Sequence, residues 1–312
     1  MYGYKTKNKK LLFIFNPRSG KEQIKNKLLR IIDIFVKQGF EVTVHPTQGP
    51  QDARRMIERK AGKYGLIVCS GGDGTLDETV TGMMHRGKKV PIGFIPAGTT
   101  NDFAKSLNIP KDMIKAAQIA INGRPFACDV GNFNGDYFIY IAAFGVFTDI
   151  AYETSQDLKN ILGHAAYVLE GIKRLPSIHA YHMKVEYGEQ IFEDDFIYGM
   201  VTNSTSVGGF KNMTGKDVLL DDGVFEVMLI KMPQNPLELN EIVGNLVNLV
   251  DGTDFIYSFK TDYLKITAEE DIPWTLDGEF GGNHRELEIR NENKAIELMI
   301  KNDKIGLSLN GK

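Results

Sequence analysis

The chain has few cysteines and no long apolar run. Its two cysteines, Cys69 and Cys128, show neither a CxxC pairing nor the spacing of a zinc site, so we expect buried free thiols in a reducing compartment. The longest apolar run, residues 139–147, has nine residues, whereas spanning a bilayer takes roughly 20. No apolar segment of the signal-peptide kind follows the charged N-terminus. We therefore expect a cytoplasmic protein, for which any membrane contact must be peripheral.

Two common nucleotide-binding motifs are also absent. No GxxxxGK[ST] sequence occurs, because Gly20-Lys21 is followed by Glu22. No GxGxxG sequence follows a predicted strand, because Gly72 and Gly74 lead into Thr-Leu-Asp. These absences exclude a P-loop and the usual dinucleotide fingerprint as the origin of any phosphate binding.

The composition is that of a globular protein, with 42% hydrophobic and 25% charged residues, and 312 residues suffice for two domains. The net charge of −3 gives no reason to expect a nucleic acid as partner. The first 30 residues nevertheless carry nine Lys and Arg against one acid, Glu22, a local balance of +8. This stretch is either a solvated start of the chain or a basic patch that meets anionic phosphate or lipid headgroups.

Apolar runs alternate with stretches of helical spacing over the first 125 residues. Strands are predicted at residues 11–15, 40–45, 66–69 and 91–95, and helices at 21–37, 51–63 and 75–85. Such alternation indicates βαβ units around a mostly parallel sheet.

Strand-like segments dominate after residue 125. Asn134-Gly135 is a strong signal for a hairpin between strands at 126–131 and 137–143. Further strands are predicted at 181–187, 196–202, 225–231, 255–267, 287–290 and 295–300, with helices at 156–173 and 236–250.

The fold class that follows is α/β plus all-β. A doubly wound parallel α/β domain is expected at residues 1–125, and an antiparallel β-sandwich domain at residues 126–312. The boundary is a shift in composition and not a flexible linker, so the two domains are expected to pack closely. The last strand either stays in the second domain or returns to the first.

Three polar loops that contain glycine follow predicted strands, at residues 16–20, 70–78 and 96–103. Carboxyl ends of parallel strands meet at one edge of a sheet, where open α/β sheets bind their ligands. Glycines let the backbone approach phosphates, but an acid among them, Asp73, repels an anion unless a metal ion bridges the two. The alternative is a tight strand-to-helix turn in which Asp73 or Thr75 caps the helix.

Two acidic turns stand out in the second half. Asp277-Gly278-Glu279 sets two acids around a glycine, and a carboxylate can remove the proton of a weakly nucleophilic alcohol. The alternative is an exposed β-turn. Taken alone, Asp222 and its neighbours also read as a plain turn.

NPRSG, GGDGTLDE and PAGTTNDFA, in this order and spacing, resemble the catalytic domain of the diacylglycerol kinase family, which includes sphingosine and ceramide kinases. The resemblance continues through residues 128–131, 152–154, 220–225 and 276–279, so it covers nearly the whole chain and is closest to the soluble enzymes of Gram-positive bacteria. NAD kinases share GGDGT and phosphofructokinases share GGDG. The LDDG and DGE segments therefore carry the assignment to a lipid kinase.

The resemblance implies a kinase that uses ATP and Mg²⁺ to convert diacylglycerol to phosphatidic acid, with the active site between the two domains. The residues implied to line the ATP site are Asn16, Pro17, Arg18, Ser19, Gly20, Thr47, Gly72, Asp73, Gly74, Thr75, Leu76, Asp77, Glu78 and Thr99. Asp73 would organise the catalytic magnesium, within a network that includes Asp102 and Asp129. The family usually has Asn at the position of Asp77.

The same resemblance assigns the two acidic turns. Asp277 and Glu279 would supply the general base. Asp222, with the backbone carbonyls of Leu219 and Val224, would hold a second, structural magnesium.

Other functions remain open at this point. The same fold serves kinases of other lipid alcohols, such as sphingoid bases or phosphatidylglycerol, and an NAD kinase would use the same glycine loop. A catalytically dead regulator that binds lipid or nucleotide is a third class, but the joint presence of Asp73 and the acids of residues 277–279 argues against it. The expected partner is a lipid at the membrane surface, with a homodimer left open.

Overall fold

The computed structural model describes residues 6–20, 22–87, 89–146, 178–204, 206–207, 210–211, 218–248 and 253–301. The helix predicted at 156–173 lies outside these residues. Within them, no helix combines the length and apolarity that crossing a bilayer requires.

The first part of the chain forms a parallel sheet with the strand order β4-β3-β1-β2. Every residue of β3 is buried, as is every residue of β1 after the first, which is why both strands read as continuous apolar runs. The strands are β1 (Lys10–Phe15), β2 (Glu41–Pro46), β3 (Leu66–Gly71) and β4 (Ile92–Pro96).

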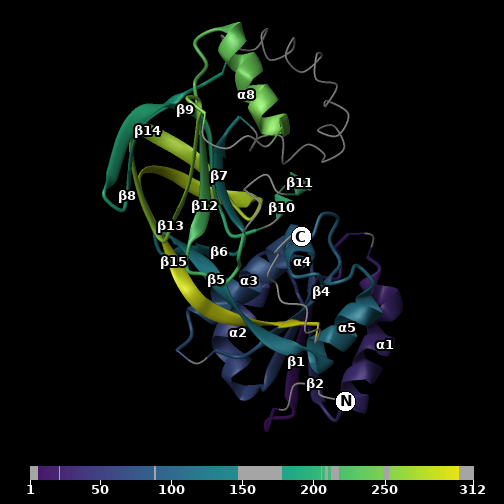
Figure 1. The fold of residues 1–312 in the computed structure, drawn as a ribbon. Coiled ribbons are helices and arrows are strands. Elements are labelled where there is room, and N and C mark those ends of the chain that lie inside the picture. Colours follow the sequence, from purple (N-terminus) through teal and green to yellow (C-terminus); the bar gives the residue numbers. More distant parts are fainter. Residues whose placement is uncertain are drawn as a thin grey trace.

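Helices cover both faces of this sheet (Figure 1). The helices are α1 (Ile24–Lys37), α2 (Asp52–Lys60, extended by the 3₁₀ turn η1 at Ala61–Lys63), α3 (Asp73–Met84), the short α4 (Asp102–Ser106) and α5 (Met113–Asn122). Helices α1 and α5 pack together, and α5 lies against β4, whereas α2 and α3 pair with each other and α3 lies against β3. The doubly wound arrangement predicted from the sequence is confirmed.

The strand order creates a switch point between β1 and β3. The chain leaves β1 toward β2 on one side and leaves β3 toward β4 on the other, so the two loops diverge above the sheet. In folds of this strand order, ligands bind at the carboxyl ends of these two strands.

Antiparallel pairing prevails in the second part. Strands β7 and β8 each pair with both β9 and β14, so these four strands close on themselves around a second core that contains Phe144 and Trp274. The strands are β5 (Arg124–Phe133), β6 (Asp136–Phe138), β7 (Ile141–Gly145), β8 (Tyr181–Tyr187), β9 (Gln190–Thr202), β10 (Ser206–Val207), β11 (Phe210–Lys211), β12 (Phe225–Lys231), β13 (Ile256–Thr261), β14 (Tyr263–Leu276) and β15 (Glu279–Ile300), with helix α8 at Pro236–Asn248. The predicted class, an α/β domain followed by a β domain, is confirmed.

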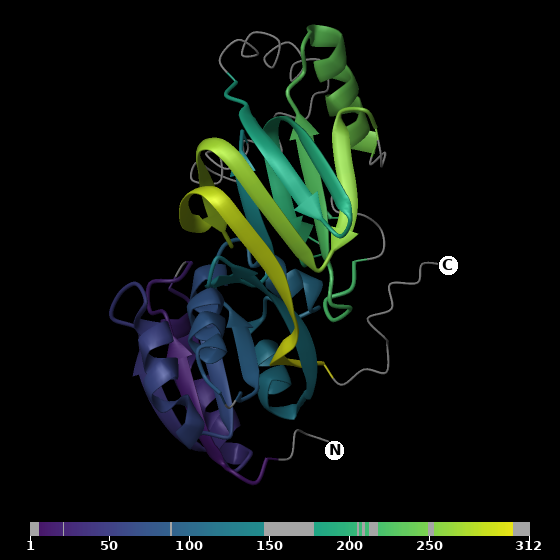
Figure 2. The same ribbon diagram turned by 90° about the vertical axis from the view of Figure 1, so that its left-hand side faces the viewer.

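Strand β15 joins the two parts. It pairs antiparallel with β14 and β5, and its residue Leu298 lies beside Ile92 of β4 in parallel register. Figure 2 shows this long strand running from the β half down to the parallel sheet. The pairing makes one continuous sheet of 13 strands. The division at residue 125 itself stays a prediction.

Several predicted boundaries differ from those observed. The turn at Asn134 and Gly135 has φ values of 51° and 93°, as a type I′ hairpin needs, but only β6 returns along β5, whereas β7 leaves to pair with β9 and β14. The strand predicted at 255–267 is two strands, and those predicted at 287–290 and 295–300 are one strand with a bulge. Cys69 and Cys128 are buried free thiols, as predicted.

Candidate active site

The three glycine loops meet at the carboxyl edge of the parallel sheet. Asn16 N–H donates to Ser70 O (2.9 Å), and Ala97 N–H donates to Gly71 O (2.7 Å), which ties the loops after β1 and β4 to the end of β3. A methyl group on Gly98 would lie 2.6 Å from Gly72 Cα, so these two glycines permit a contact between backbones. The predicted convergence of the loops is observed.

Asp73 begins helix α3 within this convergence. Its Oδ2 accepts the N–H of Asp102 (3.2 Å), while its Oδ1 is buried and has no hydrogen-bond partner among the described residues. Burial raises the pKa of Asp73 to about 6, helped by the neighbouring Asp102 carboxylate. Lys105 Nζ lies 2.7 Å from Asp102 Oδ1, so this lysine is paired with Asp102.

Asp277 reaches the site from the β half. It forms with Gly278 a two-residue turn between β14 and β15, with φ values of 51° and 87°. The Asp277 carboxylate accepts the N–H groups of Ile139 (2.7 Å), Tyr140 (3.0 Å) and Ile141 (3.0 Å). Burial raises the pKa of Asp277 to about 7, against the lowering effect of these donors. Asp277 is therefore buried and firmly held, whereas Gly278 and Glu279 of the same turn are exposed.

Glu279 follows the turn and meets helix α3. A methyl group on Gly74 would lie 3.3 Å from Glu279 Oε1, so the exposed Glu279 carboxylate stands at the first turn of α3. Asp77, one helical turn after Asp73, faces the same group of acids. Its Oδ1 is buried and finds no partner in the part of the chain that the structure describes. Burial together with the charge of Asp277 raises the pKa of Asp77 well above its usual range. Acids from both halves thus gather around the start of α3.

This arrangement fits a divalent cation that also binds phosphate. Asp73 and Asp77 each keep one buried oxygen without a donor, and a magnesium ion in a nucleotide site takes one or two carboxylates together with phosphate oxygens. Across the part of the chain that the structure describes, no group of three His, Cys, Asp or Glu side chains forms a complete metal site. The two unpartnered oxygens are the feature that fits the ion.

The residues predicted for the ATP site lie in different surroundings. Leu76 is fully buried in the core that contains the strands of the parallel sheet. Thr75 is buried against Gly71. Arg18 and Thr99 are exposed, and the Asn16 side chain accepts the N–H of Arg18 (2.9 Å), which shapes that loop.

Glu78 and Thr47 are engaged with the protein backbone. Both Glu78 oxygens accept N–H groups at the start of α2, from Gln51 (2.7 Å) and Ala53 (3.1 Å). Thr47 N–H donates to Phe15 O (2.9 Å), which places Thr47 beside the end of β1.

Asp129 lies at the turn of the β half that carries Asp222, and not in the network of Asp73 for which it was predicted. Its carboxylate accepts the N–H groups of Gly223 (2.7 Å) and Lys294 (2.7 Å) and the side-chain amide of Asn293 (3.1 Å). Asp129 therefore braces the turn that carries Asp222, whose own carboxylate accepts the N–H of Val224 (3.3 Å). The implied ligands Leu219, Asp222 and Val224 all belong to this exposed or half-buried turn.

Two residues of the site, Asn101 and Tyr140, were not predicted from the sequence. Asn101 adopts a left-handed φ of 51°, and its side chain bonds to both backbone groups of Gly98, which fixes the loop against Gly72. An Asn just before a helix is a recognisable signal for such a turn. Tyr140 donates its hydroxyl to Asp277 O (3.3 Å), and nothing in the sequence marks it.

Comparisons with known proteins show the family of the chain. A family model described as the diacylglycerol kinase catalytic domain matches residues 10–133. The chain is 36% identical over 278 residues to a diacylglycerol kinase of Bacillus subtilis (strain 168), covering 88% of this chain and 91% of that protein. It is 35% identical over 280 residues to a diacylglycerol kinase of Staphylococcus carnosus (strain TM300), covering 88% and 90%. A solved diacylglycerol kinase structure from Bacillus anthracis str. Sterne shares the fold, with a TM-score of 0.75 and 23% identity over 95% of this chain and 98% of that one.

Proposed function

Because the chain belongs to the diacylglycerol kinase family, we propose that it transfers the γ-phosphate of ATP to the hydroxyl of diacylglycerol and so forms phosphatidic acid. The observation that carries this proposal is the place of the Glu279 carboxylate beside Gly74, in the first turn of α3. It brings a carboxylate of the β half to the end of the glycine loop, where an acceptor hydroxyl has to approach a bound γ-phosphate. The lipid alcohol must lose a proton there, and a carboxylate supplies that function.

The phosphates of ATP would bind at the switch point between β1 and β3. Backbone amides of the loop at residues 70–74 and the start of α3 favour anions. A magnesium ion would be held by Asp73, with the unpartnered Asp77 oxygen beside it, and would offset charge on the phosphates when bound. The protein then contributes mainly positioning.

Glu279 is the better proton acceptor of the two acids in the hairpin. The oxygens of Asp277 already accept three backbone N–H groups and the residue is buried, whereas Glu279 is exposed. In the transfer, the lipid oxygen forms a bond to the γ-phosphorus, the bond from phosphorus to the leaving oxygen of ADP breaks, and the hydroxyl proton passes to Glu279. Asp277 positions the turn that presents Glu279.

The acceptor is tested with radiolabelled ATP and a panel in mixed micelles: diacylglycerol, a sphingoid base, phosphatidylglycerol and, as a soluble control, NAD. Label is expected in phosphatidic acid and at most weakly in the other products. Preferential labelling of a sphingoid base, phosphatidylglycerol or NAD would reassign the substrate, and no labelling of any acceptor would favour a regulator that binds without transfer.

Contact with the membrane is proposed to be peripheral, at the inner surface. The side chains of Lys7, Lys9, Lys10 and Lys25 are exposed, so the basic start of the chain is accessible to anionic headgroups. Sedimentation with vesicles should show more binding to anionic than to neutral lipid, and salt should weaken it. Equal binding to both at all salt concentrations would contradict this mode of attachment.

A further inference from the structure

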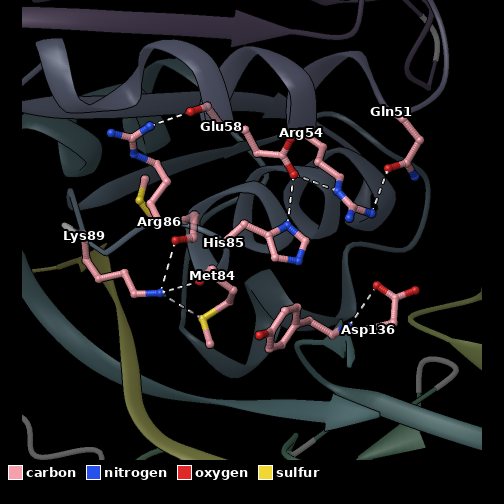
Figure 3. Close-up of polar contacts among 10 residues, drawn as sticks. Gln51, Arg54, Glu58, Met84, His85, Arg86, Lys89 and Asp136 are labelled. Carbon is pink, nitrogen blue, oxygen red and sulfur yellow. Dashed lines mark hydrogen bonds and ion pairs between the residues drawn. The ribbon is translucent and has the colours of Figure 1, made fainter. Parts of the chain in front are cut away.

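Helix α2 begins without a cap of its own. Its N-cap residue, Gln51, has a left-handed φ of 62°. The Gln51 side chain accepts no hydrogen bond from the N–H groups of the first turn. Figure 3 shows the Gln51 side chain turned along the helix toward Arg54, whose guanidinium donates to Gln51 Oε1 at 3.4 Å. The first N–H groups of a helix lack partners within the helix and need an acceptor from elsewhere.

Glu78 supplies that acceptor from the neighbouring helix α3. Its Oε1 accepts the Gln51 N–H (2.7 Å) and its Oε2 accepts the Ala53 N–H (3.1 Å), so both oxygens of one carboxylate are used. A carboxylate at the N-terminus of a helix is favoured by the helix dipole as well as by these bonds. Helices α2 and α3 are close enough for this because Gly82 has no side chain, and a methyl group there would lie 2.8 Å from Arg54 O.

The contact fixes the segment at residues 47–53, which follows β2. One end of this segment is held by Thr47, whose N–H donates to Phe15 O (2.9 Å) at the end of β1. The other end is held by Glu78 on the helix that Asp73 begins. Asp52 braces the middle, since its carboxylate accepts the Gln48 N–H (2.9 Å). The course of the loop from Thr47 to the start of α2 therefore depends on Glu78.

We propose that Glu78 is a positioning residue, which sets the place of the loop after β2 beside the glycine loop and thereby the affinity for ATP. Its carboxylate is committed to two backbone amides, so it acts through the loop and not by touching the nucleotide. This role rests on the proposed function, because it assumes that ATP binds at the carboxyl edge of the parallel sheet, where β1, β2 and β3 end.

The test compares Glu78→Ala, Glu78→Gln and a matched control, Glu58→Gln. Glu58 is a half-exposed glutamate of α2 that pairs with Arg54 and His85 and holds no N–H of the loop (Figure 3). Hydrogen exchange at the amides of Gln51 and Ala53, measured without nucleotide, reports the contact itself. Steady-state kinetics and direct ATP binding report its consequence, and thermal melting verifies folding.

In Glu78→Ala, both amides should exchange about tenfold faster or more, and the KM for ATP should rise about tenfold while kcat stays within about twofold. Glu78→Gln keeps one oxygen acceptor, so its exchange rates and its KM for ATP should lie between those of the wild type and Glu78→Ala. Glu58→Gln should match the wild type in exchange and in KM. Unchanged exchange in Glu78→Ala would overturn the proposal, as would a fall in kcat at constant KM. If the exchange result held but the wild type bound no ATP, the proposed function would fail and the nucleotide role of Glu78 with it.

Discussion

Tyr140 and Asp277 are joined twice. The Tyr140 N–H donates to Asp277 Oδ1 (3.0 Å), and the Tyr140 hydroxyl donates to Asp277 O (3.3 Å). The Tyr140 ring also stacks on Phe103 of α4, with ring centroids 6.4 Å apart. Because Asp102 in the same short helix donates its N–H to Asp73, one run of contacts links the nucleotide-side acid to the turn that presents Glu279. The geometry of the site thus depends on both halves of the protein.

The anchoring role of Asp277 can be separated from proton transfer. In Asp277→Ala, the N–H groups of Ile139, Tyr140 and Ile141 lose their acceptor, so their hydrogen exchange should accelerate and turnover should fall by about 10²-fold through misplacement of Glu279. In Glu279→Gln, the same amides should exchange as in the wild type. Equal protection of these amides in Asp277→Ala and the wild type would show that the turn is held by other means.

Asp73→Asn should fold and yet lose nearly all kinase activity, by 10²-fold or more as an order of magnitude. The reason is that the neutral amide cannot hold a cation at the position where Asp73 Oδ1 lies buried without a partner. Thermal melting should show that Mg-ATP stabilises the wild type much more than the variant, and a chelator should remove that difference. Near wild-type turnover in Asp73→Asn would refute the assignment of the nucleotide site.

The free energy of unfolding should depend on pH through Glu226, which lies outside the candidate active site. It is buried in β12 with Lys260 Nζ 2.9 Å from its Oε1, and burial raises the pKa of Glu226 from 4.5 to about 7. The folded state therefore keeps a proton that the unfolded chain releases above pH 4.5. The stability that this proton provides is fully present below pH 4.5 and is lost as the pH rises through about 7.

In Glu226→Gln this dependence is absent. The free energy of unfolding of the variant relative to the wild type should therefore rise by roughly 3 kcal/mol between pH 4.5 and pH 8. Urea denaturation at both pH values measures the change. A constant difference between the two proteins would mean that Glu226 is not a buried acid with a raised pKa.

The brace at Asp129 and the turn at Asp222 should respond differently to substitution. Asp129→Ala leaves the N–H groups of Gly223 and Lys294 without an acceptor, so the free energy of unfolding should fall by about 2–4 kcal/mol with or without a chelator. Asp222→Ala should lower the melting temperature only when Mg²⁺ is present, because Asp222 is exposed and its predicted role is to hold an ion. A chelator should then shift the wild type but hardly the Asp222 variant. Melting of Asp222→Ala like the wild type, with Mg²⁺ and with chelator alike, would exclude a structural ion at this turn.

Features that depend on the local sequence pattern, namely the buried strands, their loops and one tight turn, were predictable. Strands β1 and β3 are apolar because both faces are covered, and their loops converge because parallel strands end at one edge. Asn134 and Gly135 suit a type I′ turn whatever surrounds them. Helix α5 also has a local signal that was not used for prediction. Asp112 is its N-cap and accepts the N–H groups of Ile114 and Lys115.

Features that depend on packing between distant segments were not predictable. The bond between Asp129 and Lys294 joins residues 165 positions apart, and the bulge that leads to it in β15 has no local signature. The capping of α2 by Glu78 arises only after α2 and α3 pack together. From the sequence, Asp277 was a slight favourite over Glu279 for the general base, because its side chain is shorter and more rigidly held. Only the donors around Asp277 separate their roles.

The central claim is that Glu279 takes the proton of the lipid hydroxyl at a site built from both halves of the chain. The most direct test is transfer of label from radiolabelled ATP to diacylglycerol in mixed micelles by the wild type and Glu279→Gln, with ATP affinity and melting temperature measured on the same samples. Turnover is expected to fall by about 10²–10⁴-fold in the variant, with ATP affinity and melting temperature unchanged. Full turnover of diacylglycerol by Glu279→Gln would contradict the account.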